Sequence, residues 1–397
     1  MANHLKKRPV TVIGGGIAGL TVARALALRG AVVTVIEQAD ALREVGAGLQ
    51  ISPNGFRVLK ALGLDEPLAA VAPRAQAVEL WNGETGDRVV RLDLLAHYPG
   101  HPFRLAWRPR LIDILAKGAT DAGVRVVLGQ RLERAVFDDE GVALTFAGGV
   151  QRHAALVIGA DGLHSRLRAL AAGTPQPRPF FTGQVAWRAV IPAGRTEAVL
   201  PQVFMGRGRH VVSYPMGHGL RNIVAVEERR DWVEESWHLT DDPLTLRAAF
   251  RDFAGPVRGW LAQVETPYLW GLFRHPVAAR WGRVEGAGAV AILGDAAHPT
   301  LPFLAQGAVM AIEDAWVLAA MLDRHADVDQ ALTAYQAARR HRAQEIVEAA
   351  NRNARNYHLS GLPRLAAHTG LRMLAAFAPS KLLDRFDWVY DYDATAE

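Results

Sequence analysis

A glycine run between two apolar stretches constrains the fold of this 397-residue chain most strongly. Residues 9–13 (PVTVI) are apolar and β-branched, as a buried parallel strand requires, and residues 20–29 are rich in alanine and leucine, which favours a helix. Between them, residues 14–19 match G-x-G-x-x-G, and a second apolar stretch, 31–36, ends at Glu37. This order of strand, glycine turn, helix, strand and acidic residue predicts a βαβ unit that binds a dinucleotide.

Each residue of this motif has a physical task. Gly14 permits the tight turn, Gly16 lets the backbone approach a pyrophosphate, and Gly19 allows the helix to pack closely on the strand. The N-terminus of the helix offers backbone N–H groups to the anion. Glu37 can accept hydrogen bonds from both ribose hydroxyls, which favours FAD or NAD over NADP.

Two later segments repeat the pattern of a strand that runs into a turn and a helix. The first, 156–168, contains Gly159-Ala160-Asp161-Gly162, and the second, 289–299, contains Gly294-Asp295. Asp295 at a strand end can bind the hydroxyls of a ribityl chain, and Gly307, before a helix, offers N–H groups to an electron-rich ring. Either segment alone is also typical of an ordinary connection.

Together the three segments resemble the signatures of the single-component FAD-dependent aromatic hydroxylases, the class A flavoprotein monooxygenases. The stretch 305–315 (AQGAVMAIEDA) is most similar to the salicylate, 3-hydroxybenzoate 6- and 6-hydroxynicotinate hydroxylase branch. The resemblance implies an α/β fold, with a Rossmann-like FAD-binding domain interleaved with a β-sheet substrate domain and followed by a C-terminal helical segment. It also implies FAD contacts by Glu37, Arg43, Arg108, Asp161 and Asp295.

The activity implied by the resemblance is hydroxylation of a small phenolic or N-heteroaromatic acid with O2 and NADH or NADPH, through a flavin hydroperoxide. A second G-x-G-x-x-G before a helix is missing, so NAD(P)H is expected as a transient co-substrate without a Rossmann domain of its own. Two alternatives stay open. One is the same fold acting as an epoxidase or as a ubiquinone-pathway or drug-modifying monooxygenase, and the other is a flavin-binding protein without turnover.

The interleaving predicts the domain boundaries. Residues 1–75, 106–175 and 276–325 carry the nucleotide-binding pattern, and residues 76–105 and 176–275 are strand-like and rich in aromatic side chains. Residues 326–397 form the expected helical segment, in which Tyr335, Ala338 and Ile346 should pack inward. Arg339, Arg340 and Arg342 are expected on its solvent-exposed face.

The candidate catalytic residues are His210, Tyr214 and Gln306. Alternate residues of a strand share one face, so His210, Val212 and Tyr214 should point the same way. We expect His210 to be the base that takes the phenol proton, with Tyr214 as its hydrogen-bonding companion, and the family comparison places Gln306 at the substrate. A histidine at the solvent end of an edge strand is the plain alternative for His210. His298 and His164 are weaker candidates for the base.

Composition excludes several other classes. The chain has no cysteine, so disulfides, thiolate metal sites and cysteine nucleophiles are ruled out, and no spacing typical of metal ligands is present. The 45 basic residues nearly balance the 40 acidic ones, which argues against nucleic-acid binding despite a net charge of +5. No stretch has the roughly 20 apolar residues of a membrane span. We expect a cytoplasmic monomer or homodimer that contains no metal.

Overall fold

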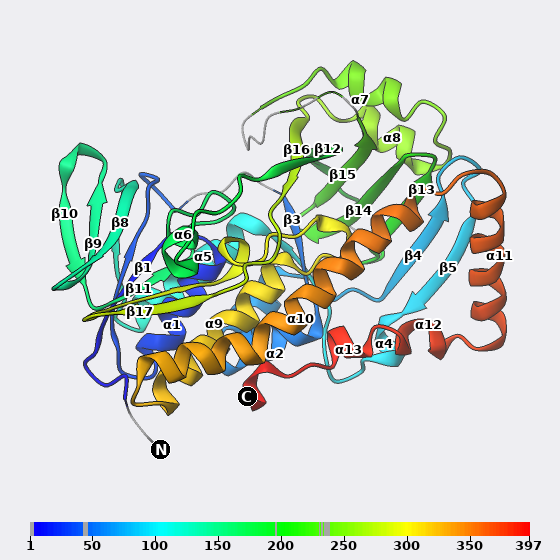
Figure 1. Ribbon diagram of the computed structural model, residues 1–397. Coiled ribbons are helices and arrows are strands. Elements are labelled where there is room, and N and C mark those ends of the chain that lie inside the picture. Colours follow the sequence, from blue (N-terminus) through cyan, green and yellow to red (C-terminus); the bar gives the residue numbers. More distant parts are fainter. Residues whose placement is uncertain (1–3, 43–46, 195–196, 230, 232, 234–238) are drawn as a thin grey trace.

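The computed structural model describes residues 4–42, 47–194, 197–229, 231, 233 and 239–397. Two large sheets organise this part of the chain (Figure 1). The first has six strands in the order β17-β18-β11-β1-β2-β7, all parallel to their neighbours except β17, which runs antiparallel to β18. Its strands are β1 (Pro9–Ile13), β2 (Val32–Ile36), β7 (Arg125–Val127), β11 (Leu156–Gly159), β17 (Gly282–Glu285) and β18 (Gly288–Ile292).

The second sheet has seven strands in the order β16-β12-β15-β14-β13-β4-β5. Only β13 and β4 pair in parallel, and the other pairs are antiparallel. Its strands are β4 (Ala77–Asn82), β5 (Arg88–Asp93), β12 (Phe180–Pro192), β13 (Gln202–Gly206), β14 (Arg209–Gly217), β15 (Leu220–Glu228) and β16 (Tyr268–Arg274). The first sheet therefore draws its strands from segments 1–75, 106–175 and 276–325, and the second draws them from 76–105 and 176–275. The assignment of these segments to an FAD domain and a substrate domain stays a prediction.

Helices complete the two halves. Around the first sheet lie α1 (Ile17–Ala27), α2 (Pro53–Ala61), α3 (Asp65–Val71), α5 (Arg108–Asp121), α6 (Leu167–Ala172) and α9 (Gly307–Arg324). One face of the second sheet packs its apolar side chains, such as Trp187 and Phe204, against α7 (Pro243–Ala249) and α8 (Pro256–Ala262). Because side chains alternate along a strand, the opposite face of that sheet is free to line a cavity.

Two smaller sheets lie beside these halves. One is β10-β9-β8, formed by β8 (Leu132–Asp138), β9 (Gly141–Phe146) and β10 (Gln151–Ala154). The other pairs β3 (Gly48–Ile51) with β6 (Arg104–Trp107). The mixed α/β architecture predicted from the sequence is confirmed.

The C-terminal part is helical, as expected. The long helix α10 (Val328–Tyr357) packs along α9 and extends toward the second sheet, and α11 (Gly361–Phe377) lies beside β5 (Figure 1). Tyr335 and Ile346 are fully buried, and Ala338 is half-buried against the same core, as predicted. The predicted solvent-exposed arginine face is wrong, because Arg339 is 0% and Arg342 8% exposed. Both make buried ion pairs with acidic residues of α9, which the spacing within α10 alone does not reveal.

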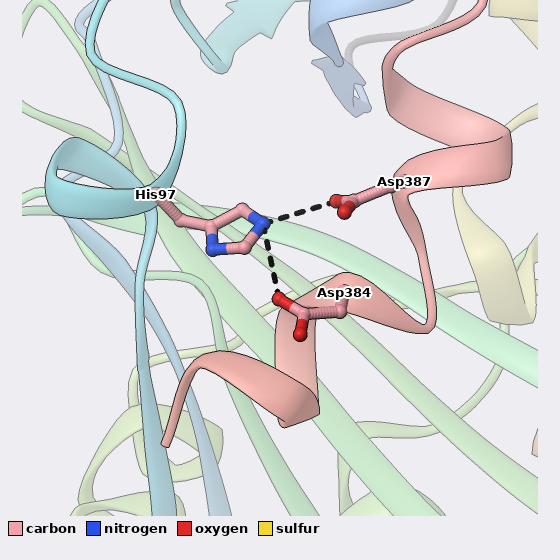
Figure 2. A group of neighbouring side chains, drawn as sticks. All are labelled: His97, Asp384 and Asp387. Atoms are coloured by element: carbon pink, nitrogen blue, oxygen red, sulfur yellow. Dashed lines mark hydrogen bonds and ion pairs between the residues drawn. The ribbon is translucent and has the colours of Figure 1, made fainter. Parts of the chain in front are cut away.

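Polar contacts attach the end of the chain to α4 (Leu94–His97) (Figure 2). His97 Nε2 lies 3.0 Å from Asp387 Oδ1, on α13 (Asp387–Tyr390), and 3.9 Å from Asp384 Oδ1, on α12 (Ser380–Asp384). The Tyr98 hydroxyl also donates to Asp387, at 2.7 Å. One ligand atom from each of His97, Asp384 and Asp387 lies within 4.8 Å of the others. The absence of a metal stays a prediction.

Within the described residues, no helix has both the length and the apolar character that crossing a membrane requires.

Candidate active site

A cavity of about 810 Å³ is lined by residues of both large sheets. The lining includes the glycine turn after β1 and Glu37, which directly follows β2. The lining also includes side chains from the open face of the second sheet, which are Arg188, His210, Val212, Tyr214, Val224, Val226 and Trp270. This volume is in the range of cavities that hold small molecules and cofactors.

The glycine turn has the geometry that its motif requires. Gly14 has φ +106°, and a Cβ there would lie 2.2 Å from the carbonyl oxygen of Ala160. A Cβ on Gly19 would lie 1.8 Å from the carbonyl oxygen of Gly14, so no larger residue fits at either position. Gly16 is the N-cap of α1, it carries no capping side chain, and it lines the cavity. The positive end of α1 therefore borders the cavity, as an anion site requires.

Glu37 lies beside this turn. The backbone N–H of Gly15 donates to its Oε2 at 2.5 Å and that of Ala39 donates to its Oε1 at 2.9 Å. These bonds hold the carboxylate in place at the cavity wall, and each oxygen keeps a lone pair for a further donor.

Four more predicted cofactor residues line the same cavity, namely Arg108, Asp161, Asp295 and Gly307. Burial lowers the pKa of Arg108 to about 10, and the negative charge of Asp295 opposes this shift. Oδ2 of Asp161 accepts from the backbone N–H groups of Arg166, at 2.8 Å, and Leu167, at 3.4 Å. Oδ1 of Asp161 is buried and has no hydrogen-bond partner in the structure, and burial raises the pKa of this carboxyl. Arg43 lies outside the described residues.

On β14, His210 and Tyr214 lie on one face, with Val212 between them, and all three line the cavity. His210 is 1% exposed, and its Nδ1 lies 2.8 Å from Nε2 of His358. Burial lowers the pKa of His210 well below its ordinary value, and His358 lowers it further. The ring is therefore neutral at physiological pH.

The expected bond between His210 and Tyr214 is wrong. His210 pairs with His358, and the side chain of Tyr214 interacts with Gln50. Four residues along an extended strand span roughly 13 Å, so residues on one face at this spacing cannot bond directly. Burial raises the pKa of Tyr214 well above the usual value, so its hydroxyl stays protonated.

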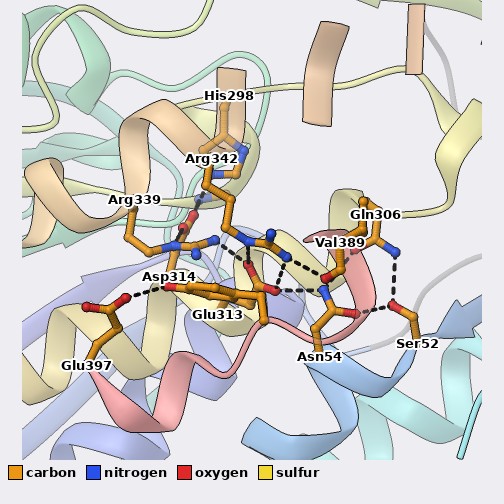
Figure 3. Close-up of polar contacts among 12 residues, drawn as sticks. Ser52, Asn54, His298, Gln306, Glu313, Asp314, Arg339, Arg342, Val389 and Glu397 are labelled. Atoms are coloured by element: carbon orange, nitrogen blue, oxygen red, sulfur yellow. Dashed lines mark hydrogen bonds and ion pairs between the residues drawn. The ribbon is translucent and has the colours of Figure 1, made fainter. Parts of the chain in front are cut away.

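Gln306 is the N-cap residue of α9 and is buried. Its Oε1 accepts from Asn54 Nδ2 at 3.0 Å, and its Nε2 donates to Ser52 Oγ at 2.9 Å (Figure 3). It is not among the side chains that line the cavity. These contacts place its amide in the wall behind the site, and a contact with substrate stays a prediction.

Behind this wall lies a group of four buried ionised side chains, Glu313, Asp314, Arg339 and Arg342, here called the charged cluster (Figure 3). Glu313 accepts from Arg339 at 2.5 Å, from Arg342 at 3.0 Å and from Asn54 at 2.6 Å. Arg339 Nε also donates to Asp314 at 2.8 Å. The cluster thus links α9 and α10 to the residues that hold Gln306.

His298 joins the charged cluster through Asp314 rather than facing substrate. Burial by itself would raise the pKa of Asp314, but the charges and hydrogen bonds of His298 and Arg339 outweigh it and lower this pKa to about 2. His298 is buried against Asp314 and is not among the residues that line the cavity, so it is not placed to act as the base, and a role near the cofactor stays a prediction. His164 is exposed and lines the cavity.

Sequence reasoning missed Arg188, on β12. This side chain is 7% exposed, lines the cavity and lies 4.7 Å from the centre of the Trp270 ring. Burial, followed by the charge of Arg108, lowers the pKa of Arg188 to about 9, so it is still charged at neutral pH. The sequence of this strand did carry a signal, because Arg188 is a charged residue within an otherwise apolar stretch of β12.

Comparison with known proteins identifies the class. Residues 7–350 match the family model described as FAD binding domain. The chain is 35% identical to 3-amino-4-hydroxybenzoate 2-monooxygenase PtnB3 of Streptomyces platensis, over 97% of this chain and 96% of that protein. It is 30% identical to 3-hydroxybenzoate 6-hydroxylase of Polaromonas naphthalenivorans, over 99% of this chain and 98% of that protein. Among solved structures, Klebsiella pneumoniae HpxO complexed with FAD and uric acid matches with a TM-score of 0.82 at 25% identity, covering 96% and 97% of the two chains.

The chain therefore belongs to the FAD-dependent aromatic hydroxylase family, and it is a flavoprotein monooxygenase. The family predicted from the three signatures is confirmed. Relatives with 35% identity are 3-amino-4-hydroxybenzoate 2-monooxygenases, a group that the sequence signatures did not single out.

The residues of this chain fit FAD. The glycine turn and the open end of α1 suit a pyrophosphate, Glu37 suits a ribose, and the buried Oδ1 of Asp161 can accept a hydroxyl hydrogen bond. Arg108, Asp295 and Gly307 line the same cavity as this region and as His210.

Proposed function

We propose that this chain hydroxylates a small phenolic or N-heteroaromatic acid with O2 and NADH or NADPH. The main support is that one cavity is lined by the glycine turn at Gly14, by the proposed base His210 and by a buried cation, Arg188. FAD, when bound, supplies the oxygen chemistry. The protein has to bind the aromatic acid, orient it and manage its proton.

The proton is the difficult part. An unperturbed phenol has a pKa of about 10 and an unperturbed histidine about 6.5, so direct transfer costs about 5 kcal/mol. Burial of His210 makes the cost larger, because a buried imidazolium is disfavoured. Arg188 supplies the compensation, because a buried positive charge stabilises a phenolate or carboxylate in the same cavity.

These charges suggest a role for each residue. Arg188 pairs with the anionic substrate, and His210 takes the phenol proton. Tyr214, four residues along the same face of β14, donates its hydroxyl hydrogen to the substrate. The proposed substrate group includes the compounds in the names of the relatives, 3-amino-4-hydroxybenzoate and 3-hydroxybenzoate. We also propose that the protein works in the cytoplasm as a monomer or homodimer, which light scattering of the purified protein tests in part.

The test is to purify the protein, record the flavin spectrum and screen aromatic acids for NADH, NADPH and O2 consumption with product identification. A stimulated consumption that yields a ring-hydroxylated product supports the proposal. Cofactor oxidation that no aromatic acid stimulates contradicts it, and an epoxide product assigns the chain to the alternative chemistry.

His210→Ala gives the first residue-level prediction. We expect hydroxylation to fall by about 10²- to 10⁴-fold, the usual contribution of a positioned base, while FAD content stays at the wild-type level. His153→Ala is the matched control, because His153 pairs with Asp138 at 2.9 Å on the small sheet and does not line the cavity. Unchanged turnover in His210→Ala removes this residue as the base.

A further inference from the structure

A chain of three side chains, here called the histidine chain, runs from the cavity wall to the protein surface. Its members are His210 on β14, His358 at the C-cap of α10 and Glu228 at the end of β15. His210 Nδ1 lies 2.8 Å from His358 Nε2, and His358 Nδ1 lies 2.7 Å from Glu228 Oε1. Both distances are those of hydrogen bonds.

Exposure increases along this chain. The side chain of His358 is 3% exposed and that of Glu228 is 55% exposed, while His210 lines the cavity. Val224 and Val226 of β15 also line the cavity, so alternation places Glu228 on the same face, at the rim of the sheet. The backbone fixes this rim, because the N–H of Glu228 donates to the carbonyl oxygen of Gly208 at 2.9 Å.

Aromatic rings pack beside His210, and a second histidine bonds to it. The rings of Phe303 and Tyr357 lie 5.3 Å and 5.2 Å from its ring, and His358 is the titratable group that bonds to it. Nearby charges are paired elsewhere, because Arg209 of β14 pairs with Asp252, and Glu227 of β15 pairs with Arg229. An extra proton on His210 is unfavourable, because it would create a buried positive charge. The hydrogen bond to His358 offers a path by which a proton can leave His210 toward the protein surface.

Building on the proposed function, we propose that His358 and Glu228 form a proton relay that carries the substrate phenol proton from His210 to solvent. The O–H bond of the phenol breaks, its electron pair stays on the phenolate oxygen, and the proton passes to His210 Nε2. The Nδ1 proton of His210 passes to His358 Nε2, and the Nδ1 proton of His358 passes to Glu228, which releases it to water. Both imidazoles end neutral with exchanged tautomers, so no positive charge remains buried.

The test measures ionisation of a bound phenol directly. The probe is 4-hydroxy-3-nitrobenzoate, whose phenolate is coloured, mixed with the FAD-loaded protein in a stopped-flow instrument below the probe's solution pKa. Wild-type protein should form bound phenolate rapidly, with a slower rate in D2O. His358→Gln should slow phenolate formation by about ten-fold or more, and Glu228→Gln should slow it less, because water can replace an exposed carboxylate.

Two controls separate the relay from a structural role. His153→Gln and Asp138→Asn remove a histidine–carboxylate pair of the same kind on the small sheet and should leave the rate unchanged. FAD content and thermal unfolding of His358→Gln should match the wild type closely enough to exclude misfolding, and His358→Asn provides a second variant if the first is unstable.

The outcomes are distinct. If wild-type protein forms phenolate but both His358 variants do so within two-fold of its rate and with the same D2O effect, the relay is wrong and the proposed function stands. If wild-type protein neither binds nor ionises the probe, and no aromatic acid stimulates cofactor oxidation, the proposed function fails and the relay fails with it.

Discussion

The charged cluster and the histidine chain are both buried polar groups next to one cavity, yet they differ in kind. The charged cluster joins two carboxylates and two guanidinium groups whose charges balance, and its side chains are at most 9% exposed. The histidine chain holds two imidazoles that burial keeps neutral and ends at an exposed carboxylate. Balanced permanent charges fix geometry, because any proton movement there leaves an unpaired charge. Neutral imidazoles can pass protons along a hydrogen-bonded chain without leaving an unpaired charge behind.

The comparison predicts different stabilities, and the charged cluster should show the largest effect. Glu313→Gln leaves Arg339 and Arg342 short of a buried counter-charge, so we expect a loss of about 3–5 kcal/mol in the free energy of unfolding. Urea denaturation measures it. The control is Glu348→Gln on α10, whose pair with Arg352 is exposed and 4.0 Å long, with an expected loss below about 0.5 kcal/mol. Equal losses in the two variants would contradict the distinction.

The acid range gives a second, smaller effect. The folded-state pKa of Asp314 is about 2, below its ordinary value of 3.8. Its contribution to the stability of the fold is therefore present above about pH 4 and is lost as the pH falls toward 2. By linkage this contribution is on the order of 2 kcal/mol. The free energy of unfolding, measured by urea denaturation at several pH values between 5 and 2, should therefore depend less on pH in Asp314→Asn than in the wild type. Parallel curves would show that Asp314 does not hold its charge as described.

The histidine chain should matter least for stability. His358→Gln removes one hydrogen bond to a neutral imidazole and one to the exposed carboxylate of Glu228. Glutamine can restore one of them, so we expect a loss of about 1 kcal/mol or less in the free energy of unfolding. The same denaturation assay measures it beside Glu313→Gln. A loss as large as that of Glu313→Gln would mean that His358 is ionised in the folded protein. That result would contradict the distinction between the charged cluster and the histidine chain.

Local sequence was enough for much of the cofactor site. The spacing of Gly14, Gly16, Gly19 and Glu37 describes contacts made within a single βαβ unit, and backbone geometry alone explains why glycine is needed at Gly14. The shared face of His210 and Tyr214 followed from strand alternation in the same way.

The partners of these residues depended on contacts between distant segments. His210 and His358 are 148 positions apart, and Gln306 and Ser52 are 254 apart. The charged face expected on α10 turned inward because α9 presents Glu313 and Asp314 to it, which the sequence of α10 does not encode. Spacing within an element reveals which side chains share a face, but only the packing of elements decides which groups that face meets. By itself, the sequence determined the fold class and the FAD signatures, and it singled out His210. The tertiary structure decided that this ring is buried and paired with His358, because both depend on how distant elements pack together.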